Sequence, residues 1–276
     1  MSCYYPIPGW RSSRINPETG KRSIVFRPGD GLIDQPIEVP CGKCLGCRAD
    51  QSLMWSIRAY HESTLHERNS FVTFTYDDAH LPSDGLIVKK HLQDFFKRLR
   101  KSYPPKAIRY IACGEYGDTT KRPHYHAILF GDDFLWDKVV IDDQLYTSPW
   151  LQKKWGMGHV SIAPVTMASI CYTCGYVMKK IGDEDTFSLM SRRPPIGHDW
   201  LSKYKSDLIR TGFVTIEGRQ YPVPSRYLDW SPDEFEELKK ERLRLIRQRN
   251  PVEYREGLRA REKNRKAKTS GRKEKL

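Results

Sequence analysis

Two histidines separated by one residue, His124 and His126, lie in a segment whose composition predicts a β-strand, residues 123–131. Successive side chains of a strand point to opposite faces, so both imidazoles project from the same side. They lie about 6–7 Å apart along the strand, which suits one divalent cation held between them. Residues 108–117 predict the partner strand of a hairpin, and a Glu115 opposite His124 would bring its carboxylate to the same ion. Such a set leaves coordination positions open for a substrate oxygen, as a catalytic metal requires.

Paired histidines on a strand are otherwise ordinary half-exposed residues, so this metal site gains weight only if the chain also offers a nucleophile. The segment 166–181 predicts a helix that Thr166 caps and Gly182 ends. At 100° per residue, the stripe expected to face the core consists of Ile170, Cys174, Val177 and Ile181. The opposite face carries two tyrosines and two lysines, Tyr172, Tyr176, Lys179 and Lys180.

A phenol with a pKa near 10 is a poor nucleophile at neutral pH, but a neighbouring ammonium favours the phenolate and also binds a phosphate. The alternative is that these tyrosine rings only pack within the protein. That alternative is weakened because other side chains already fill the inward stripe of the helix.

Three segments occur in the chain in a fixed order: FVTFTYDD, RPHYHAILFG and YTCGYVMKKI. They resemble the three motifs of the rolling-circle replication initiators with a His-hydrophobic-His metal site, most closely those of the gokushovirus branch of the microviruses. The resemblance extends to CGKCLGC, FFKRLRK, CGEYGD, LYTSP and MSRRPPIG, and covers roughly Cys3 to Trp230. Tyr125 departs from the family pattern, which has an aliphatic residue between the histidines, and should point to the opposite face.

The resemblance implies an endonuclease and strand transferase that acts on single-stranded origin DNA with Mg²⁺ or Mn²⁺. It assigns the metal to His124 and His126, and the tyrosine–lysine motif to Tyr172, Tyr176 and Lys180, with Lys179 as an alternative to Lys180. One tyrosine attacks the phosphodiester to form a 5′-phosphotyrosyl link and a free 3′-OH, which host polymerase extends before the strand is resealed. The implied partners are origin DNA and host helicase and polymerase in the host cytoplasm, with no membrane and no small-molecule cofactor.

The elements that must position these residues follow the order strand, helix, strand, strand, insertion, strand, helix. The strands are expected at 71–76, 108–117, 123–131 and 159–165, the helices at 48–67, 88–101 and 166–181, and the insertion at 132–158 with a short helix near 150–155. This order predicts an α+β fold, an antiparallel sheet with helices on one face, as in ferredoxin-like or RNA-recognition-like domains.

Four segments are expected along the chain. They are an N-terminal extension with a zinc site and a helix (1–68), a metal- and tyrosine-dependent nuclease core (69–185), a C-terminal extension of that core (186–230), and a charged helix with a basic tail (231–276). Ser231 is the expected N-cap of the last helix, with Pro232 at its first position. We expect the Lys/Arg-rich terminus to be disordered without a partner.

The formal net charge is +13, and residues 259–276 alone carry nine Lys/Arg against two Glu. This excess favours a polyanionic partner, nucleic acid first and an anionic membrane surface second, although the tail could also serve solubility alone. No apolar run approaches the ~20 residues that span a bilayer, and the N-terminus lacks a signal-peptide pattern. The sequence therefore predicts a soluble, intracellular protein.

An odd number of cysteines, seven, argues against a disulfide framework in such a chain. Cys41, Cys44 and Cys47 have back-to-back C-x2-C spacing, which gathers thiolates around a tetrahedral ion, normally Zn²⁺. A fourth ligand must come from elsewhere, and Cys3 is the first choice. The alternatives are reduced cysteines without a metal and an iron–sulfur cluster.

Three other functions compete with nicking. A non-catalytic, zinc-containing nucleic-acid-binding regulator explains the charge and the cysteines but not the histidine pair or the tyrosine face. A phosphodiesterase with two H-x-[ST] repeats is disfavoured because the chain has a single HxH. An RNA-binding module fits the fold alone and predicts neither nicking nor a preference for DNA.

Overall fold

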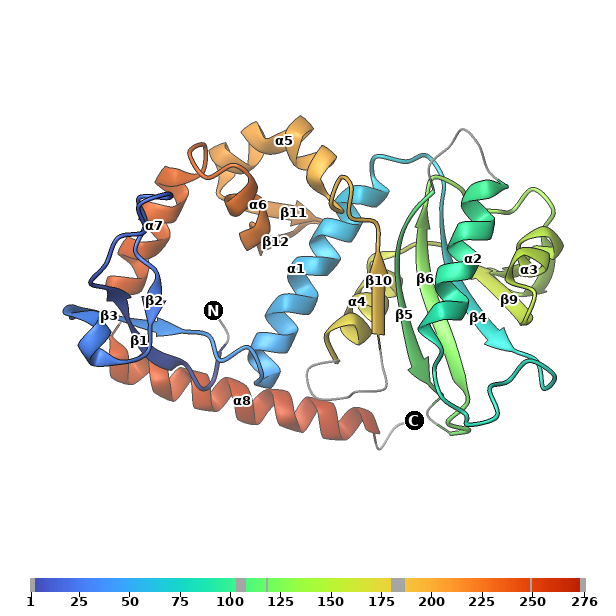
Figure 1. Ribbon diagram of the computed structural model, residues 1–276, viewed down its shortest axis with the longest axis horizontal. Coiled ribbons are helices and arrows are strands. Elements are labelled where there is room, and N and C mark those ends of the chain that lie inside the picture. Colours follow the sequence, from blue (N-terminus) through green and yellow to red (C-terminus); the bar gives the residue numbers. More distant parts are fainter. Residues whose placement is uncertain (1–2, 103–107, 118, 180–186, 249, 274–276) are drawn as a thin grey trace. The chain divides into compact units, whose positions relative to one another are not determined.

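The computed structural model describes residues 3–102, 108–117, 119–179, 187–248 and 250–273 (Figure 1). The chain divides into two compact units. The smaller contains Met1–Gln51 and Arg244–Leu276, and the larger contains Ser52–Leu243. The candidate catalytic residues belong to the larger unit, and the four cysteines expected to bind zinc belong to the smaller one.

A seven-stranded antiparallel sheet forms the centre of the larger unit, with strand order β10-β5-β6-β4-β9-β8-β7. Its strands are β4 (Asn69–Tyr76), β5 (Arg109–Tyr116), β6 (Pro123–Phe130), β7 (Val139–Asp142), β8 (Leu145–Thr147), β9 (Gly158–Ala163) and β10 (Phe187–Met190). In β4 each second residue is buried, as the alternation of FVTFTY predicts.

Two helices connect strands within this sheet, α2 (Lys89–Lys101) and α3 (Pro149–Trp155). The succession β4-α2-β5-β6-α3-β9, with β5-β6-β4-β9 as neighbours, is the ferredoxin-like order. Both helices pack on the same face of the sheet, where Phe95 and Trp155 meet Phe74 and Tyr125 in one core. The expected α+β class with a large antiparallel sheet is therefore confirmed.

The expectation that helices cover one face alone is wrong. The second half of α1 (Leu45–Ser63) and α4 (Met167–Lys179) cover β5 and β6 from the other side, so that α2 and α4 flank these strands in Figure 1. This second core contains Ile111, Cys113, Ile128, Phe130, Ile170 and Cys174. The reason is that β6 is apolar at successive positions rather than at alternate ones, which buries both of its faces.

Beyond the sheet, the larger unit continues with α5 (His198–Thr211), β11 (Phe213–Ile216), β12 (Arg219–Pro222), α6 (Ser225–Trp230) and most of α7 (Glu236–Arg247). The helix expected from Ser231 begins at Glu236 instead. Ser231 is the C-cap of α6, and its carbonyl accepts a hydrogen bond from the amide of Phe235, whose buried ring holds the intervening turn.

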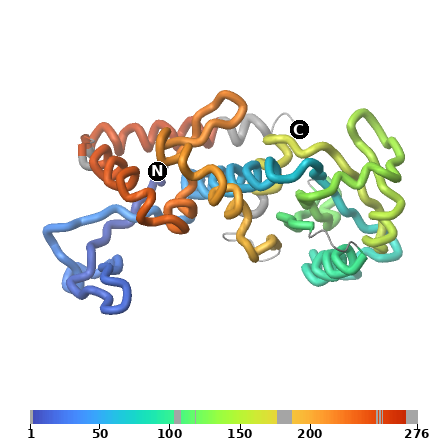
Figure 2. Tube along the Cα trace, turned by 90° about the horizontal axis from the view of Figure 1, so that it is seen from above, coloured from blue at the N-terminus to red at the C-terminus, as the bar shows by residue number. Residues whose placement is uncertain are grey.

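In the smaller unit β1 (Ile7–Ser12) pairs with β2 (Ile24–Val25) and β3 (Gly31–Val39), which agrees with the expected short strands. The basic terminus, expected to be disordered, forms the helix α8 (Pro251–Lys273), red in Figures 1 and 2. Within it Lys266 pairs with Glu262 one turn away at 2.8 Å, and Glu262 accepts a hydrogen bond from Tyr5. None of the described helices is long and apolar enough to span a bilayer.

Acid should destabilise the larger unit through His61. Its buried ring stacks on Trp200 at 3.4 Å and lies 2.9 Å from the Tyr227 hydroxyl, and burial lowers the pKa of His61 to about 3. Below an unfolded-state pKa of about 6.5 the unfolded chain binds a proton that the folded unit excludes, so stability falls with falling pH. Between pH 7.5 and 5 we expect a loss of about 2 kcal/mol from this group.

Urea unfolding followed by tryptophan fluorescence at the two pH values measures this loss. His61→Phe should remove about 2 kcal/mol of the pH dependence. The matched change at the exposed His198, His198→Phe, should leave the pH dependence as it is. An unchanged pH dependence in His61→Phe would contradict the assignment.

Candidate active site

The β5–β6 hairpin sets the position of the two histidines. Its register pairs Glu115 with His124 and Cys113 with His126, so that all four side chains project from one face. The hairpin turn is closed by the Gly117 amide, which donates to the Arg122 carbonyl at 3.0 Å. The structure thus contains the cross-strand pair that the sequence analysis expected.

Three potential ligand atoms converge on this face. Glu115 Oε1 lies 3.0 Å from His124 Nε2 and 2.7 Å from His126 Nε2. The two imidazole rings are perpendicular, with centroids 4.9 Å apart. Glu115 and His126 are buried and His124 is partly exposed, so the group, called the metal centre below, opens to solvent on the His124 side.

The remaining ring nitrogens are oriented by the backbone and by β4. His124 Nδ1 lies 3.2 Å from the Arg122 carbonyl oxygen, which can only accept, so Nδ1 carries the proton and Nε2 keeps its lone pair in the neutral ring. His126 Nδ1 lies 3.0 Å from Thr73 Oγ1, and Phe71 stacks on the His126 ring at 5.5 Å. Metal-bound histidines are held by their second nitrogen in this same way.

The charge of Glu115 fits a cation. Burial by itself would raise its pKa, but hydrogen bonds with His124 and His126, the positive charge of His126 and the Tyr172 hydroxyl lower the pKa of Glu115 to about 2. The carboxylate is therefore ionised at neutral pH. Its second oxygen, Oε2, is buried without a hydrogen-bond partner, which is costly unless a cation or solvent completes the group. Two imidazoles and this carboxylate are a suitable donor set for a divalent metal.

Helix α4 brings a tyrosine to the metal centre. Its start is fixed by reciprocal capping, with the Ser169 amide donating to Thr166 Oγ1 at 3.1 Å and the Thr166 amide donating to Ser169 Oγ at 2.9 Å. The Tyr172 hydroxyl donates to Glu115 Oε1 at 2.8 Å. Its ring meets His126 edge-on at 5.1 Å and is 44% exposed, so a substrate can still reach it.

The inward stripe of α4 is buried at both positions that can be assessed, Ile170 and Cys174. The backbone of α4 continues through Tyr176 and Lys179, whose side chains fall outside the described structure, as Val177 does. Lys180, Ile181 and Gly182 lie outside the described residues altogether. The structure therefore places one of the two predicted tyrosines at the metal centre.

Tyr125, between the histidines, points to the opposite face as expected and is fully buried among the aromatic residues of the first core. Phe71 and Thr73 are the site residues that sequence reasoning missed. Both lie on the outward set of the β4 alternation, and the register that pairs Thr73 with His126 places them beside the metal centre. Their alternation with the buried Val72 and Phe74 was the available signal.

A second metal-ligand group lies in the smaller unit. The sulfurs of Cys3, Cys41, Cys44 and Cys47 lie within 4.8 Å of one another. Backbone amides point at them: Cys41 N lies 3.2 Å from Cys3 Sγ, and Cys44 N and Cys47 N each lie 3.4 Å from the sulfur three residues earlier. Such bonds stabilise thiolates, so this cysteine cluster could hold a metal.

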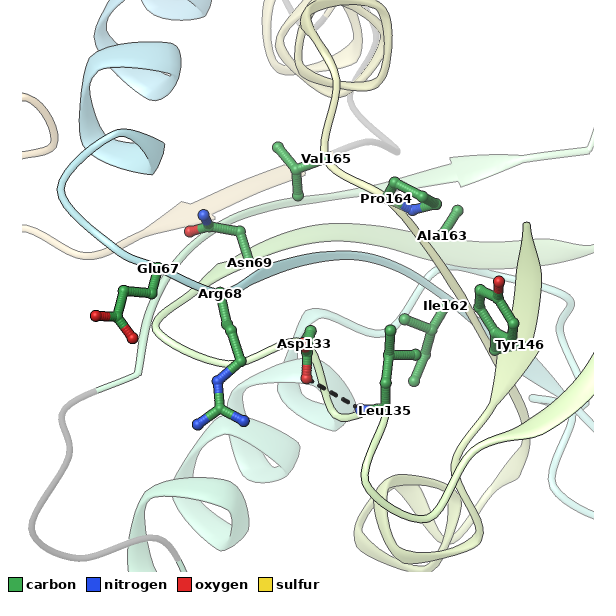
Figure 3. A pocket seen from close by; sticks show the side chains of 10 residues that line it. All are labelled: Glu67, Arg68, Asn69, Asp133, Leu135, Tyr146, Ile162, Ala163, Pro164 and Val165. Atoms are coloured by element: carbon green, nitrogen blue, oxygen red, sulfur yellow. Dashed lines mark hydrogen bonds between the residues drawn. The ribbon is translucent and has the colours of Figure 1, made fainter.

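A pocket of about 310 Å³ lies at the start of β4, where Figure 3 shows Asn69, Arg68 and Glu67 facing the loop at Asp133 and Leu135. The metal centre is at the other end of this strand, because His124 pairs with Thr75 and Phe130 pairs with Asn69. None of the predicted site residues lines the pocket, and we assign no chemistry to it.

The comparisons with known proteins point to one group. The family of the replication-associated protein ORF2 matches residues 69–181, which contain β4, the hairpin and α4. Replication-associated protein VP4 of Bdellovibrio phage phiMH2K is 35% identical over 209 residues, covering 69% of this chain and 66% of that protein. Replication-associated protein ORF2 of Spiroplasma virus 4 is 38% identical over 162 residues, covering 53% and 50% of the two chains.

Replication-associated protein ORF4 of Chlamydia phage 1 is 32% identical over 212 residues, covering 69% of this chain and 53% of that protein. No solved structure matches. The chain belongs to the replication-associated proteins of these phages, which confirms the resemblance to the microvirus initiators at the level of the family. It spans between half and two thirds of the length of these relatives.

Thr73 should matter for metal affinity although it does not touch the ion. Thr73→Val keeps the shape of the side chain but removes the oxygen that orients His126, so we expect Mn²⁺ binding to weaken roughly 10–100-fold. Isothermal titration with Mn²⁺ measures this. Thr75→Val is the matched control, because Thr75 lies two residues along the same strand and its hydroxyl contacts the His159 carbonyl. Equal losses in both variants would contradict the role of Thr73.

Proposed function

We propose that this protein is a replication initiator that cuts one strand of origin DNA with Tyr172 as the nucleophile. The observation that carries the proposal is the 2.8 Å hydrogen bond from the Tyr172 hydroxyl to Glu115 Oε1. It places a phenol beside the three groups that would hold a catalytic ion, Glu115, His124 and His126. Membership in a family of phage replication-associated proteins supports DNA as the substrate.

The donor set bears on which ion is used. Carboxylate oxygens suit both Mg²⁺ and Mn²⁺, whereas two imidazole nitrogens are better ligands for Mn²⁺ than for Mg²⁺. When bound, the ion supplies polarisation of the scissile phosphodiester and neutralises charge that develops on it. Held on two paired strands and by Thr73, His126 and Glu115 need little reorganisation to receive it.

The proposed reaction is a transesterification. The Tyr172 oxygen bonds to phosphorus and the bond from phosphorus to the 3′ oxygen breaks, so the phenolic proton is lost and the departing oxygen gains one. Glu115 orients the phenol before attack through the hydrogen bond that it accepts. One phosphodiester replaces another, so a later 3′-OH can reseal the strand without ATP.

The second tyrosine of the motif supports a second cut. Tyr176 lies one turn beyond Tyr172 on α4, and residues four apart on a helix are neighbours on its surface. We propose that it attacks after one circuit of replication. The resemblance assigns Lys180, or Lys179 in its place, to stabilise the phenolate and contact the phosphate.

The face of β9 beside the metal centre is open enough for an unpaired strand. Val160 and Ile162 of β9 are buried, whereas His159 on its other face is exposed. The register aligns His159 with Thr75 and Thr75 with His124, so His159 lies two strands from the ligand. We propose that single-stranded DNA crosses this face, as a melted origin would supply, in the host cytoplasm beside the host helicase and polymerase.

A non-catalytic, zinc-containing regulator is the second candidate function, because the cysteine cluster is well formed. It leaves unexplained why a buried carboxylate binds two histidines and a half-exposed tyrosine. Nicking of single-stranded DNA discriminates between the two functions.

Removing the Tyr172 hydroxyl tests the proposal. Tyr172→Phe should lower formation of the covalent protein–DNA product at least a thousandfold in the first cut, because no other placed oxygen occupies that position, while DNA binding stays unchanged. The assay uses Mn²⁺, labelled single-stranded fragments tiling a phage genome, and a denaturing gel. Tyr116→Phe is the control, since its hydroxyl accepts a hydrogen bond from the Ile87 amide away from the metal centre. Undiminished product from Tyr172→Phe would refute the assignment.

We further propose that the cysteine cluster binds one structural Zn²⁺. Purified protein should contain one zinc per chain by mass spectrometry of the metal content, and Cys44→Ser should lose it and destabilise the smaller unit, because a structural zinc contributes directly to folding. Cys171→Ser, a change at an exposed cysteine outside the cluster, should retain the metal. Iron in place of zinc, or equal zinc in both variants, would contradict this.

A further inference from the structure

The segment Ser191–Gly197, called the arginine loop here, connects β10 to α5 (Figure 1) and belongs to the motif MSRRPPIG. It carries two adjacent exposed arginines, Arg192 and Arg193. The proposed nicking chemistry does not use this motif. Within the described part of the chain, neither guanidinium has an ion-pair or hydrogen-bond partner.

The backbone of this loop is held by charged side chains from two different elements. Arg58 of α1 donates from Nε to the Ile196 carbonyl at 3.0 Å, and Arg109 of β5 donates from Nη2 to the Pro194 carbonyl at 2.9 Å. Glu62 of α1 accepts from the Gly197 amide at 2.8 Å. At the start of the loop, the Ser191 amide donates to the Tyr110 carbonyl at 2.9 Å.

These anchors are unusual because they are ionised groups taken out of water. Arg58 is 6% exposed and Glu62 is 2% exposed. Burying such charges is costly unless they are paired, and here Glu62 pairs with Arg109 while the Arg58 guanidinium lies 4.1 Å above the Trp55 ring. An apolar contact would have held a surface loop at lower cost. The network instead fixes the course of the backbone on both sides of Arg193.

We propose that the arginine loop is a preorganised phosphate-binding element that grips single-stranded DNA away from the cut. Arginine binds phosphate through a planar fork of donors, and a rigid backbone reduces the entropy lost on binding. Arg109 and Glu115 project from the same face of β5, six residues apart, so the loop lies roughly 20 Å along the strand from the metal centre. The contacted phosphates are therefore several nucleotides from the scissile one.

The choice of DNA rests on the proposed function, in which a single strand is the substrate. Other polyanions, an RNA or an anionic bilayer, would meet the same charges and are outcomes of the test. The binding measurements are made in EDTA with the full chain, so they do not depend on nicking.

The first experiment compares two double variants by fluorescence anisotropy with a labelled single strand of about 20 nucleotides over a series of salt concentrations. Arg192→Ala/Arg193→Ala should weaken binding roughly tenfold at about 0.15 M salt and reduce the slope of log K against log salt by about 1.4, the value for two lost phosphate contacts. The control, Arg210→Ala/Arg226→Ala, removes equal charge from exposed arginines that pair with neighbouring aspartates. Its binding should change less than about twofold.

The second experiment separates anchoring from charge. Arg109→Lys keeps the charge but loses the fork that reaches both Glu62 and Pro194, so affinity should fall severalfold while Arg192 and Arg193 are intact. Circular dichroism and thermal unfolding establish that each variant is folded.

Equal weakening in the loop and control variants would overturn the proposal. So would an arginine-dependent loss confined to RNA or to phosphatidylglycerol vesicles. Failure of the nicking assays with loop-dependent DNA binding intact would refute the proposed function alone, and the reverse pattern would refute this inference alone.

Discussion

One carboxylate oxygen organises the candidate active site. Glu115 Oε1 lies within hydrogen-bonding distance of both histidines and of the Tyr172 hydroxyl, at 3.0, 2.7 and 2.8 Å. A buried carboxylate stays ionised only where cationic or donating groups surround it, and here three of them do. The same requirement makes the site receptive to a cation, because Oε2 is still without a partner. The proposed chemistry depends on this single convergence.

The rest of the larger unit maintains that convergence. The β5–β6 register aligns Glu115 with His124, and β4 supplies Thr73 and Phe71 to fix His126. Helix α4 has to stay docked on the sheet for Tyr172 to reach the carboxylate, and the burial of Ile170 and Cys174 against β5 and β6 holds it there. Local alternation, helix periodicity and core packing thus all act on one oxygen atom.

Two of these levels could be predicted from the sequence. Strand alternation predicted the common face of His124 and His126, and 100° periodicity predicted that Tyr172 faces away from the Ile170 stripe. The covering of the second sheet face by α1 and α4, the late start of α7 at Glu236 and the helix in the basic terminus were not predicted. They depend on contacts between distant segments, such as Tyr5 with Glu262, which no local pattern contains.

The most direct test of the account is where a metal binds. Crystals grown or soaked with Mn²⁺ and measured at the manganese absorption edge would locate the ion by anomalous scattering. The account predicts one strong peak bounded by His124 Nε2, His126 Nε2 and a Glu115 oxygen, with the Tyr172 hydroxyl beside it. A peak elsewhere with these four side chains still bonded only to one another, or Tyr172 turned into the protein interior, would contradict it.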